Sequence, residues 1–170
     1  MPEGDANRCE RLRAQYPTFV YEGYQWREDA SGALDCSFRF RSNEIAFTPT
    51  CRFVFEGPRP RERVAAEVMD NLVFHLGLAE LPSYWKATCS PQVHVRAGAL
   101  TGDQVAFWTS VLTQGMGEFH YLNKTPLSDP GFVTIVGGEP KPHAAHRERL
   151  EGGHVIPVGG GKDSIVTLDL

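Results

Sequence analysis

Apolar and polar residues alternate along the first third of the chain. Between 34 and 41 every second residue, from Leu34 to Phe40, is apolar, and the residues between them are polar or charged. A period of two buries one face of a strand and leaves the other in water. The segments 18–26 and 45–55 carry a similar aromatic and β-branched bias, with short turn sequences between them. The pattern predicts three antiparallel strands joined by short turns.

The period changes to that of a helix in the second third of the chain. Apolar residues recur three and four positions apart, which predicts a helix from Arg61 to Ala79 that Pro82 ends. Further along, Thr101 is followed three residues later by Gln104. This spacing is typical of a capping box and predicts the start of a second helix.

The remaining segments complete the predicted layout. Short strands are predicted over 92–97 and 132–136, and the polar residues 1–17 predict a loose arm or a short helix. Residues 137–153 hold Gly, Pro, His and charges with few large apolar side chains, which is typical of a linker. We therefore predict an α+β domain over 18–136, with an antiparallel sheet packed by two helices.

Composition excludes several classes of protein. A chain of 170 residues corresponds to about one domain. Its net charge of -4 disfavours nucleic-acid binding, which usually requires a basic excess. No apolar run approaches the roughly 20 residues that span a bilayer, and the N-terminus lacks the pattern of a signal peptide. We expect a cytoplasmic protein with no membrane partner, whose four cysteines stay reduced.

The segment from His154 to Leu170 carries the clearest chemical motif. It predicts a strand, a glycine turn and the start of a helix. Consecutive glycines let backbone N–H groups approach an anion, and the helix start adds its positive dipole end. A lysine and a serine hydroxyl complete a set that suits a phosphate. The predicted phosphate-binding residues are Gly159, Gly160, Gly161, Lys162, Asp163 and Ser164.

The spacing of this loop separates it from two common phosphate motifs. A Walker A loop requires Ser or Thr after the lysine, where Asp163 stands, and a dinucleotide fingerprint requires glycine where Ser164 stands. The sequence GGGKDS instead resembles the SGGxDS pyrophosphate loop of ATP pyrophosphatases that release AMP. Gly159 replaces the first serine of that pattern. The alternative is a glycine-rich turn without a ligand.

The chain ends six residues after Ser164. A nucleotide-binding α/β domain needs several more strand–helix units. Residues 154–170 are therefore expected to be the first strand–loop–helix of an ATP-pyrophosphatase-like domain that continues in a longer enzyme, or that a truncated gene has lost.

Two further blocks, 74–100 and 104–123, precede this loop. Together the three blocks resemble the N-terminal part of the MurL family, the UDP-N-acetyl-α-D-muramoyl-L-alanyl-L-glutamate epimerases of peptidoglycan synthesis. The resemblance implies an isomerase whose substrate is a UDP-MurNAc-dipeptide with a terminal L-glutamate, which is converted to D-glutamate. It also implies ATP and a divalent metal, Mg²⁺, with AMP and pyrophosphate as products, and residues 159–164 as the ATP site.

The resemblance does not identify the base that removes the Cα proton. The candidates are Cys89 and Lys86, because a thiolate or a neutral amine can accept such a proton where its surroundings lower its pKa. The alternatives are a small buried apolar side chain for Cys89 and a solvated lysine for Lys86. His75 shares a helix face with Asn71 and is expected to be a core-edge histidine.

No metal site is predicted. His143 and His146 have ligand-like spacing but lie in a polar, proline-rich segment without a carboxylate set. The three tryptophans are expected in the core, and the arginines at 59, 61 and 63 on a solvated helix start.

Two other functions stay open at this point. One is a different AMP-forming enzyme with the same loop, such as an amide ligase or a tRNA-modifying enzyme. The other is a non-catalytic module that only binds the substrate. We expect the 170-residue chain alone to have no epimerase activity, because its nucleotide-binding part is incomplete.

Overall fold

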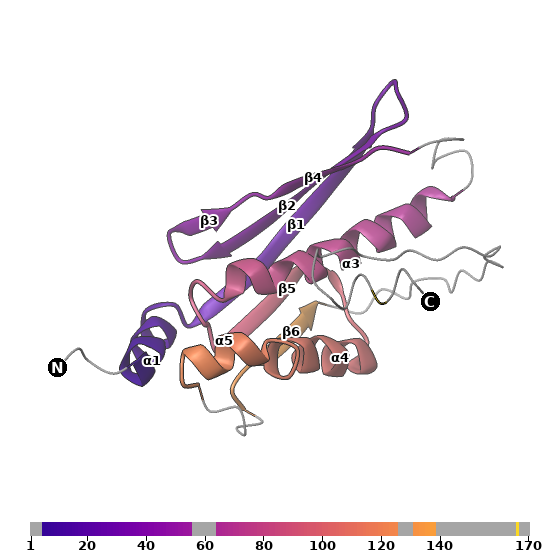
Figure 1. Cartoon of the computed structure of the whole chain (residues 1–170). Coiled ribbons are helices and arrows are strands. Elements are labelled where there is room, and N and C mark those ends of the chain that lie inside the picture. The colour runs from indigo at the N-terminus through magenta and orange to yellow at the C-terminus, as the bar shows by residue number, and fades with distance from the viewer. Residues whose placement is uncertain (1–4, 56–63, 126–130, 139–165, 167–170) are drawn as a thin grey trace.

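A computed structural model describes residues 5–55, 64–125, 131–138 and 166 (Figure 1). Its sheet has six strands in the order β3-β2-β1-β5-β6, with β4 also pairing with β2. The strands are β1 (Thr18–Glu28), β2 (Leu34–Ser42), β3 (Ile45–Phe47), β4 (Thr50–Phe53), β5 (Gln92–Ala99) and β6 (Thr134–Gly138). The helices are α1 (Asp5–Gln15), α3 (Ala66–Trp85), α4 (Gly102–Thr113) and α5 (Gly117–Leu122). The predicted α+β class, a sheet packed by helices, is confirmed.

The sheet has two halves of different character. Strands β1 to β4 pair antiparallel, as the sequence predicts. Strand β5 lies parallel to β1, and β6 lies parallel to β5, because each of them follows a helical crossover. Since β5 pairs with β1 only over Thr18–Tyr21, the second half of β1 continues with β2 and β4 as a three-stranded ribbon (Figure 1).

The third predicted strand, 45–55, is two short strands. The break falls at Thr48 and Pro49. Proline has no N–H to donate to a ladder, although the Pro49 carbonyl still accepts from the Phe38 N–H at 3.0 Å. The chain therefore stays beside β2 without one continuous ladder.

The prediction that Pro82 ends the long helix is wrong, because α3 continues through it to Trp85. The missing N–H costs one helical hydrogen bond. Leu81 and Trp85 flank the proline and are 3% and 0% exposed. Burying two such side chains stabilises the last turn by about 3–6 kcal/mol, which offsets the roughly 3 kcal/mol of a helical proline.

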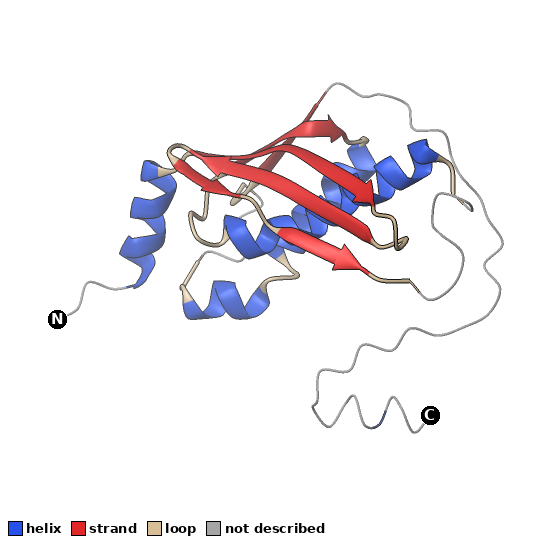
Figure 2. Ribbon diagram, turned by 90° about the horizontal axis from the view of Figure 1, so that it is seen from above, coloured by secondary structure: helices blue, strands red, loops and turns tan. Residues whose placement is uncertain are grey.

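Helices α3 and α4 cover one face of the sheet (Figure 2). The core between them is aromatic, and Tyr21, Phe38 and Trp85 are completely buried. Gly77 of α3 lies where any side chain would collide with Tyr21 and Phe38. A residue without a Cβ is therefore required at this position for α3 to approach the sheet.

The predicted capping box of α4 is confirmed. The Gln104 N–H donates to Thr101 Oγ1 at 3.3 Å, and the Thr101 N–H donates to Gln104 Oε1 at 2.9 Å. No local pattern predicts α5, which starts at Gly117 and is anchored by the buried His120. The two ring nitrogens of His120 contact Thr125 Oγ1 at 2.5 Å and the Leu112 carbonyl at 2.7 Å.

Several sequence predictions lie outside the described residues. They are the phosphate loop 159–164, most of the linker 137–153, the histidines at 143 and 146, and the arginines at 59, 61 and 63. Within the described residues, no helix is long and apolar enough to span a bilayer.

Candidate functional site

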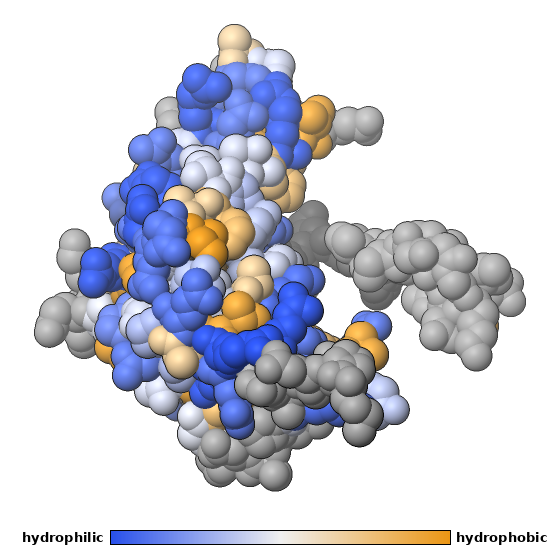
Figure 3. All heavy atoms as spheres, turned by 90° about the vertical axis from the view of Figure 1, so that its left-hand side faces the viewer, coloured by the Kyte–Doolittle hydropathy of each residue, from blue (hydrophilic) through white to orange (hydrophobic). Residues whose placement is uncertain are grey.

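Helix α1 packs against the loop that follows α3. Arg13 donates hydrogen bonds to the Cys89 carbonyl at 3.0 Å and to the Phe132 carbonyl at 2.7 Å. Its guanidinium carbon also lies 4.2 Å from the centre of the Phe132 ring. Hydrogen bonds from a charged donor contribute about 1.5–3 kcal/mol each. A single side chain thus joins the N-terminal helix to two distant segments. At this end of the molecule hydrophilic residues surround a few hydrophobic ones (Figure 3).

A small pocket of about 110 Å³ opens beside this junction. We call it the thiol pocket. Its lining residues are Arg8, Cys9, Leu12, Lys86, Ala87, Cys89, Phe119 and Asn123. The structure therefore brings Lys86 and Cys89, the two candidate bases, to one pocket. Lys86 is exposed, whereas Cys89 is 1% exposed.

The Cys89 thiol faces a second thiol. Its Sγ lies 3.1 Å from Cys9 Sγ, and its backbone has a positive φ of 52°. Burial, followed by the contact with Cys9, raises the pKa of Cys89 to about 12, and the nearby Arg13 opposes this shift. At neutral pH the thiol is therefore protonated, so in this structure it is a proton donor rather than a base.

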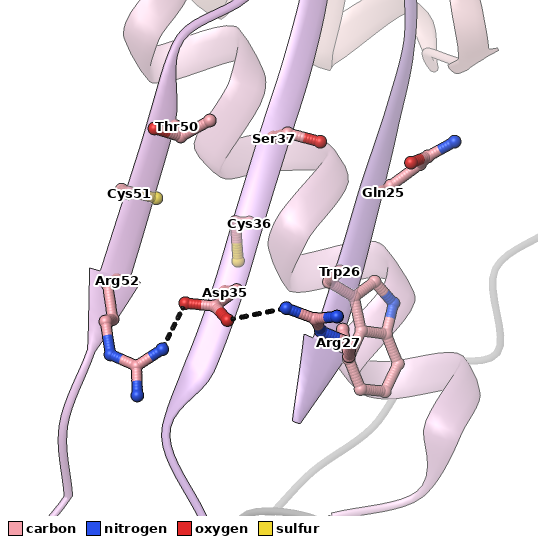
Figure 4. Close-up of a pocket in the computed structure, with 9 residues that line it drawn as sticks. All are labelled: Gln25, Trp26, Arg27, Asp35, Cys36, Ser37, Thr50, Cys51 and Arg52. Atoms are coloured by element: carbon pink, nitrogen blue, oxygen red, sulfur yellow. Dashed lines mark hydrogen bonds and ion pairs between the residues drawn. The ribbon is translucent and has the colours of Figure 1, made fainter. Parts of the chain in front are cut away.

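A second, larger cavity lies on the sheet (Figure 4). This sheet groove has a volume of about 660 Å³. Nine residues line it, and the strand register arranges them in three rows across β1, β2 and β4. The rows are Gln25–Ser37–Thr50, Trp26–Cys36–Cys51 and Arg27–Asp35–Arg52.

The rows alternate between the two faces of the sheet. Trp26 of the middle row donates its indole N–H to Asp70 of α3 at 3.3 Å, so this row faces the helices. The two outer rows point to the opposite face, since side chains alternate along a strand. The groove therefore has polar walls on the face away from α3.

Charges in the groove are held by ion pairs. Asp35 lies between Arg52, at 2.7 Å, and Arg27, at 3.3 Å (Figure 4). Arg52 also contacts Asp29 at 2.5 Å. Hydrogen bonds from Ser31, and then from Arg52, hold the pKa of Asp29 well below its usual range. Asp29 is thus ionised at neutral pH, and the two carboxylates fix the direction of the Arg52 guanidinium.

The same face carries further arginines outside the groove. Arg41 pairs with Glu22 at 2.8 Å. Arg39 lies across from Gly23 and crosses it so closely that a Cβ at Gly23 would be 2.5 Å from Arg39 Nη2. The bulge in β1 between Tyr21 and Gly23 makes room for this guanidinium. The open face of an acidic chain is therefore rich in arginine.

The other sequence candidates lie away from both cavities. His75 stacks on Trp108 and contacts Gln104 Nε2 at 3.3 Å, at the edge of the core. Asn71 Oδ1 is buried and has no hydrogen-bond partner among the described residues. The three tryptophans belong to the core, as predicted. Trp85 is fully buried in it, and Trp26 and Trp108 are partly buried and pack against the core. Within the same residues, no group of His, Cys, Asp or Glu could hold a metal ion.

Sequence reasoning missed the groove and the partner of Cys89. The alternation of residues 35, 37 and 39 predicts the exposed side of one strand. Predicting that Asp35 lies between Arg27 and Arg52 would require the register of three strands. Cys9 lies 80 residues before Cys89, and no local pattern connects them.

The comparisons identify the family. The sequence matches the MurL N-terminal domain over residues 10–170, and the chain belongs to this family.

A curated relative supports the same family assignment. Over 87 residues the chain is 30% identical to a UDP-N-acetyl-α-D-muramoyl-L-alanyl-L-glutamate epimerase of Xanthomonas oryzae pv. oryzae (strain MAFF 311018). The alignment covers 51% of this chain and 19% of the relative, so the chain matches about a fifth of that protein. No solved structure matches.

Proposed function

We propose that this chain is the N-terminal part of an ATP-dependent epimerase. The enzyme converts the terminal L-glutamate of UDP-MurNAc-L-Ala-L-Glu to D-glutamate in the synthesis of peptidoglycan precursors. The observation that carries the proposal is the family match over residues 10–170, and the name of the curated relative supports the substrate.

ATP has a chemical purpose in such an epimerisation. A free carboxylate resists loss of the neighbouring Cα proton, because the carbanion would lie beside a negative charge. Transfer of AMP to the carboxylate removes that charge and releases pyrophosphate. The Cα proton can then leave one face and return to the other, after which water hydrolyses the acyl-adenylate, restores the carboxylate and releases AMP. Residues 159–164, with Mg²⁺, are proposed to bind the ATP phosphates.

The sheet groove is proposed to bind the anionic part of the substrate. A nucleotide-sugar dipeptide carries a diphosphate and carboxylates, and arginine recognises both in a bidentate way. Arg52 is already oriented by Asp35 and Asp29. The groove volume of about 660 Å³ lies in the range of small-molecule sites.

The thiol pocket is proposed to hold the base. Lys86 is exposed and can reach a substrate at the pocket mouth. Cys89 stays a candidate only if bound substrate lowers its pKa from about 12. The two residues can also divide the work, with one removing the proton and the other returning it on the opposite face.

A full-length enzyme containing this chain tests the proposal. It is incubated with UDP-MurNAc-L-Ala-L-Glu, with or without ATP and Mg²⁺. The product is then hydrolysed in acid, and the glutamate freed from the dipeptide is analysed by chiral chromatography. We expect D-glutamate and AMP only with ATP, and loss of both in Lys162→Ala. Inversion at full rate without ATP would overturn the proposal. Binding of the substrate without inversion would instead indicate a binding module.

A further inference from the structure

The described residues place all four cysteines in two pairs. Cys9 on α1 lies 3.1 Å from Cys89 in the loop after α3. Cys36 on β2 lies directly across from Cys51 on β4. All four are free thiols. Only the Cys9–Cys89 pair joins a terminal helix to a distant loop.

We propose that Cys9 and Cys89 form an oxidation site, at which a hydroperoxide converts the two thiols into a reversible disulfide. The bond would fasten α1 to the loop that leads into β5. In reduced compartments the disulfides of proteins are usually transient and redox-sensing, which is the behaviour assigned to this pair.

The geometry holds the two sulfurs in reach of each other. Arg13, one turn after Cys9 on α1, donates to the Cys89 carbonyl at 3.0 Å. This bond fixes the helix against the loop that carries the second thiol. A sulfur–sulfur bond is about 2 Å long, so closing the 3.1 Å gap requires a movement of about 1 Å.

A small oxidant can reach the pair through the thiol pocket. Both cysteines line this cavity of about 110 Å³, which is larger than the roughly 30 Å³ that one water occupies in the liquid. Arg8 and Lys86 also line it, and Arg13, which donates to the Cys89 carbonyl, opposes the rise in the pKa of the Cys89 thiol. Cys9 is the more accessible thiol, at 8% exposure against 1% for Cys89.

The two sulfurs have different roles in the reaction. Cys9 loses its proton and attacks the terminal peroxide oxygen, the O–O bond breaks, and a sulfenic acid and a hydroxide or alkoxide leaving group form. The leaving group takes a proton and departs as water, or as an alcohol from an organic peroxide. Cys89 then attacks the Cys9 sulfur, its proton passes to the departing oxygen, and a second water leaves. Two electrons pass from the sulfurs to the peroxide.

Cys89 is the second thiol to react, because it is less exposed than Cys9 and because burial raises its pKa. Its protonated state also keeps the reduced pair stable at neutral pH. The oxidation is therefore expected to become faster as pH rises.

Mass spectrometry of the purified 170-residue chain tests the proposal without any assay of activity, so its outcome is independent of the proposed function. The chain is treated with hydrogen peroxide, free thiols are blocked with iodoacetamide, and trypsin is added. Cleavage after lysine and arginine places the four cysteines in four different peptides: 9–11, 28–39, 42–52 and 87–96.

We expect peptides 9–11 and 87–96 to appear as one linked species, about 2 Da lighter than the sum of the reduced peptides. Dithiothreitol should separate them. The oxidised chain should melt several degrees higher than the reduced chain, since an added cross-link constrains the unfolded state. Unlinked peptides, higher oxides of Cys9, or linkage of either cysteine to 36 or 51 would overturn the proposal.

Matched variants locate the effect. Cys51→Ser leaves the thiol pocket intact and should give the same linked species and the same shift in melting. Cys9→Ser should lose both, while keeping Cys89. If Cys9→Ser is poorly folded, Cys9→Ala and the wild-type peptide map still decide the question, because the map needs no variant.

Discussion

The sheet groove and the thiol pocket differ in almost every physical respect. The groove has about 660 Å³, polar walls and ion-paired charges on the face that the helices leave open. The thiol pocket has about 110 Å³ and lies where α1 closes onto the core, with buried thiols and an exposed lysine. The groove is lined by ion pairs and hydroxyl groups over a large volume, whereas the pocket holds a lysine and two thiols in little space. Under the proposed function, binding and proton transfer take place in different parts of the domain.

The largest expected effect concerns the thiol pocket. In the full-length epimerase, Lys86→Ala should lower kcat by about 10²–10⁴-fold with little change in KM, if Lys86 transfers the Cα proton. Steady-state rates of D-glutamate formation measure this. Arg96→Ala, which removes an exposed cation that lines neither cavity, is the matched control and should keep its kcat. If Lys86→Ala retains full kcat and Cys89→Ser loses it, the base is Cys89.

The attachment of α1 gives the second largest effect. Arg13→Ala leaves two carbonyls without their donor and should lower the free energy of unfolding by about 3 kcal/mol. Urea denaturation of the chain measures it. On the groove side, Arg41→Ala removes an exposed ion pair and should cost under about 1 kcal/mol. If the two variants lost the same free energy of unfolding, Arg13 would contribute no more to stability than an exposed ion pair, which would contradict this prediction.

Substrate binding tests the groove directly. Arg52→Gln should raise KM for the UDP-MurNAc-dipeptide about tenfold and leave kcat nearly unchanged, because the interaction is made in both the ground and transition states. Arg96→Gln removes an exposed positive charge that lines neither cavity and should change neither constant. A fall in kcat at constant KM would instead indicate that Arg52 and the groove act in catalysis rather than in substrate binding.

Alkaline pH probes one thiol from each region. Burial raises the pKa of both Cys36 and Cys89 to about 12, from an ordinary value of 9.0. The folded chain therefore keeps these protons while the unfolded chain releases them, and stability falls as pH rises from about 9 to 12. The slope approaches about 1.4 kcal/mol per pH unit for each thiol. Thermal melts between pH 8 and 10.5 should be flatter for Cys89→Ser and for Cys36→Ser than for the wild type.

Much of the fold could be predicted from local patterns. Alternation located β1 and β2, and the pair of Thr101 and Gln104 located the start of α4. The errors share a cause, which is that tertiary packing overrode a local rule. Burial of Leu81 and Trp85 carried α3 past Pro82, and the buried hydrogen bonds of His120 anchored a short helix beside two glycines.

The candidate sites were less predictable than the fold. Lys86 and Cys89 are three residues apart, so a segment that ends a helix could bring them to one pocket. Cys9 on α1 lines the same pocket although it lies 80 residues before Cys89, and no local pattern predicts this contact. The groove depends on the register of β1, β2 and β4, which sequence periodicity does not determine.

The position of α1 has a consequence for the order of folding. The hairpin of β1 and β2 joins neighbouring segments, whereas β1 can pair with β5 only after α3 has folded back to align Thr18 with Gln92. Arg13 needs two carbonyls, at Cys89 and Phe132, that reach their places later still. We therefore expect α1 to dock after the loop that carries Cys89 and the segment that carries Phe132 have folded into place, although it precedes both in the sequence.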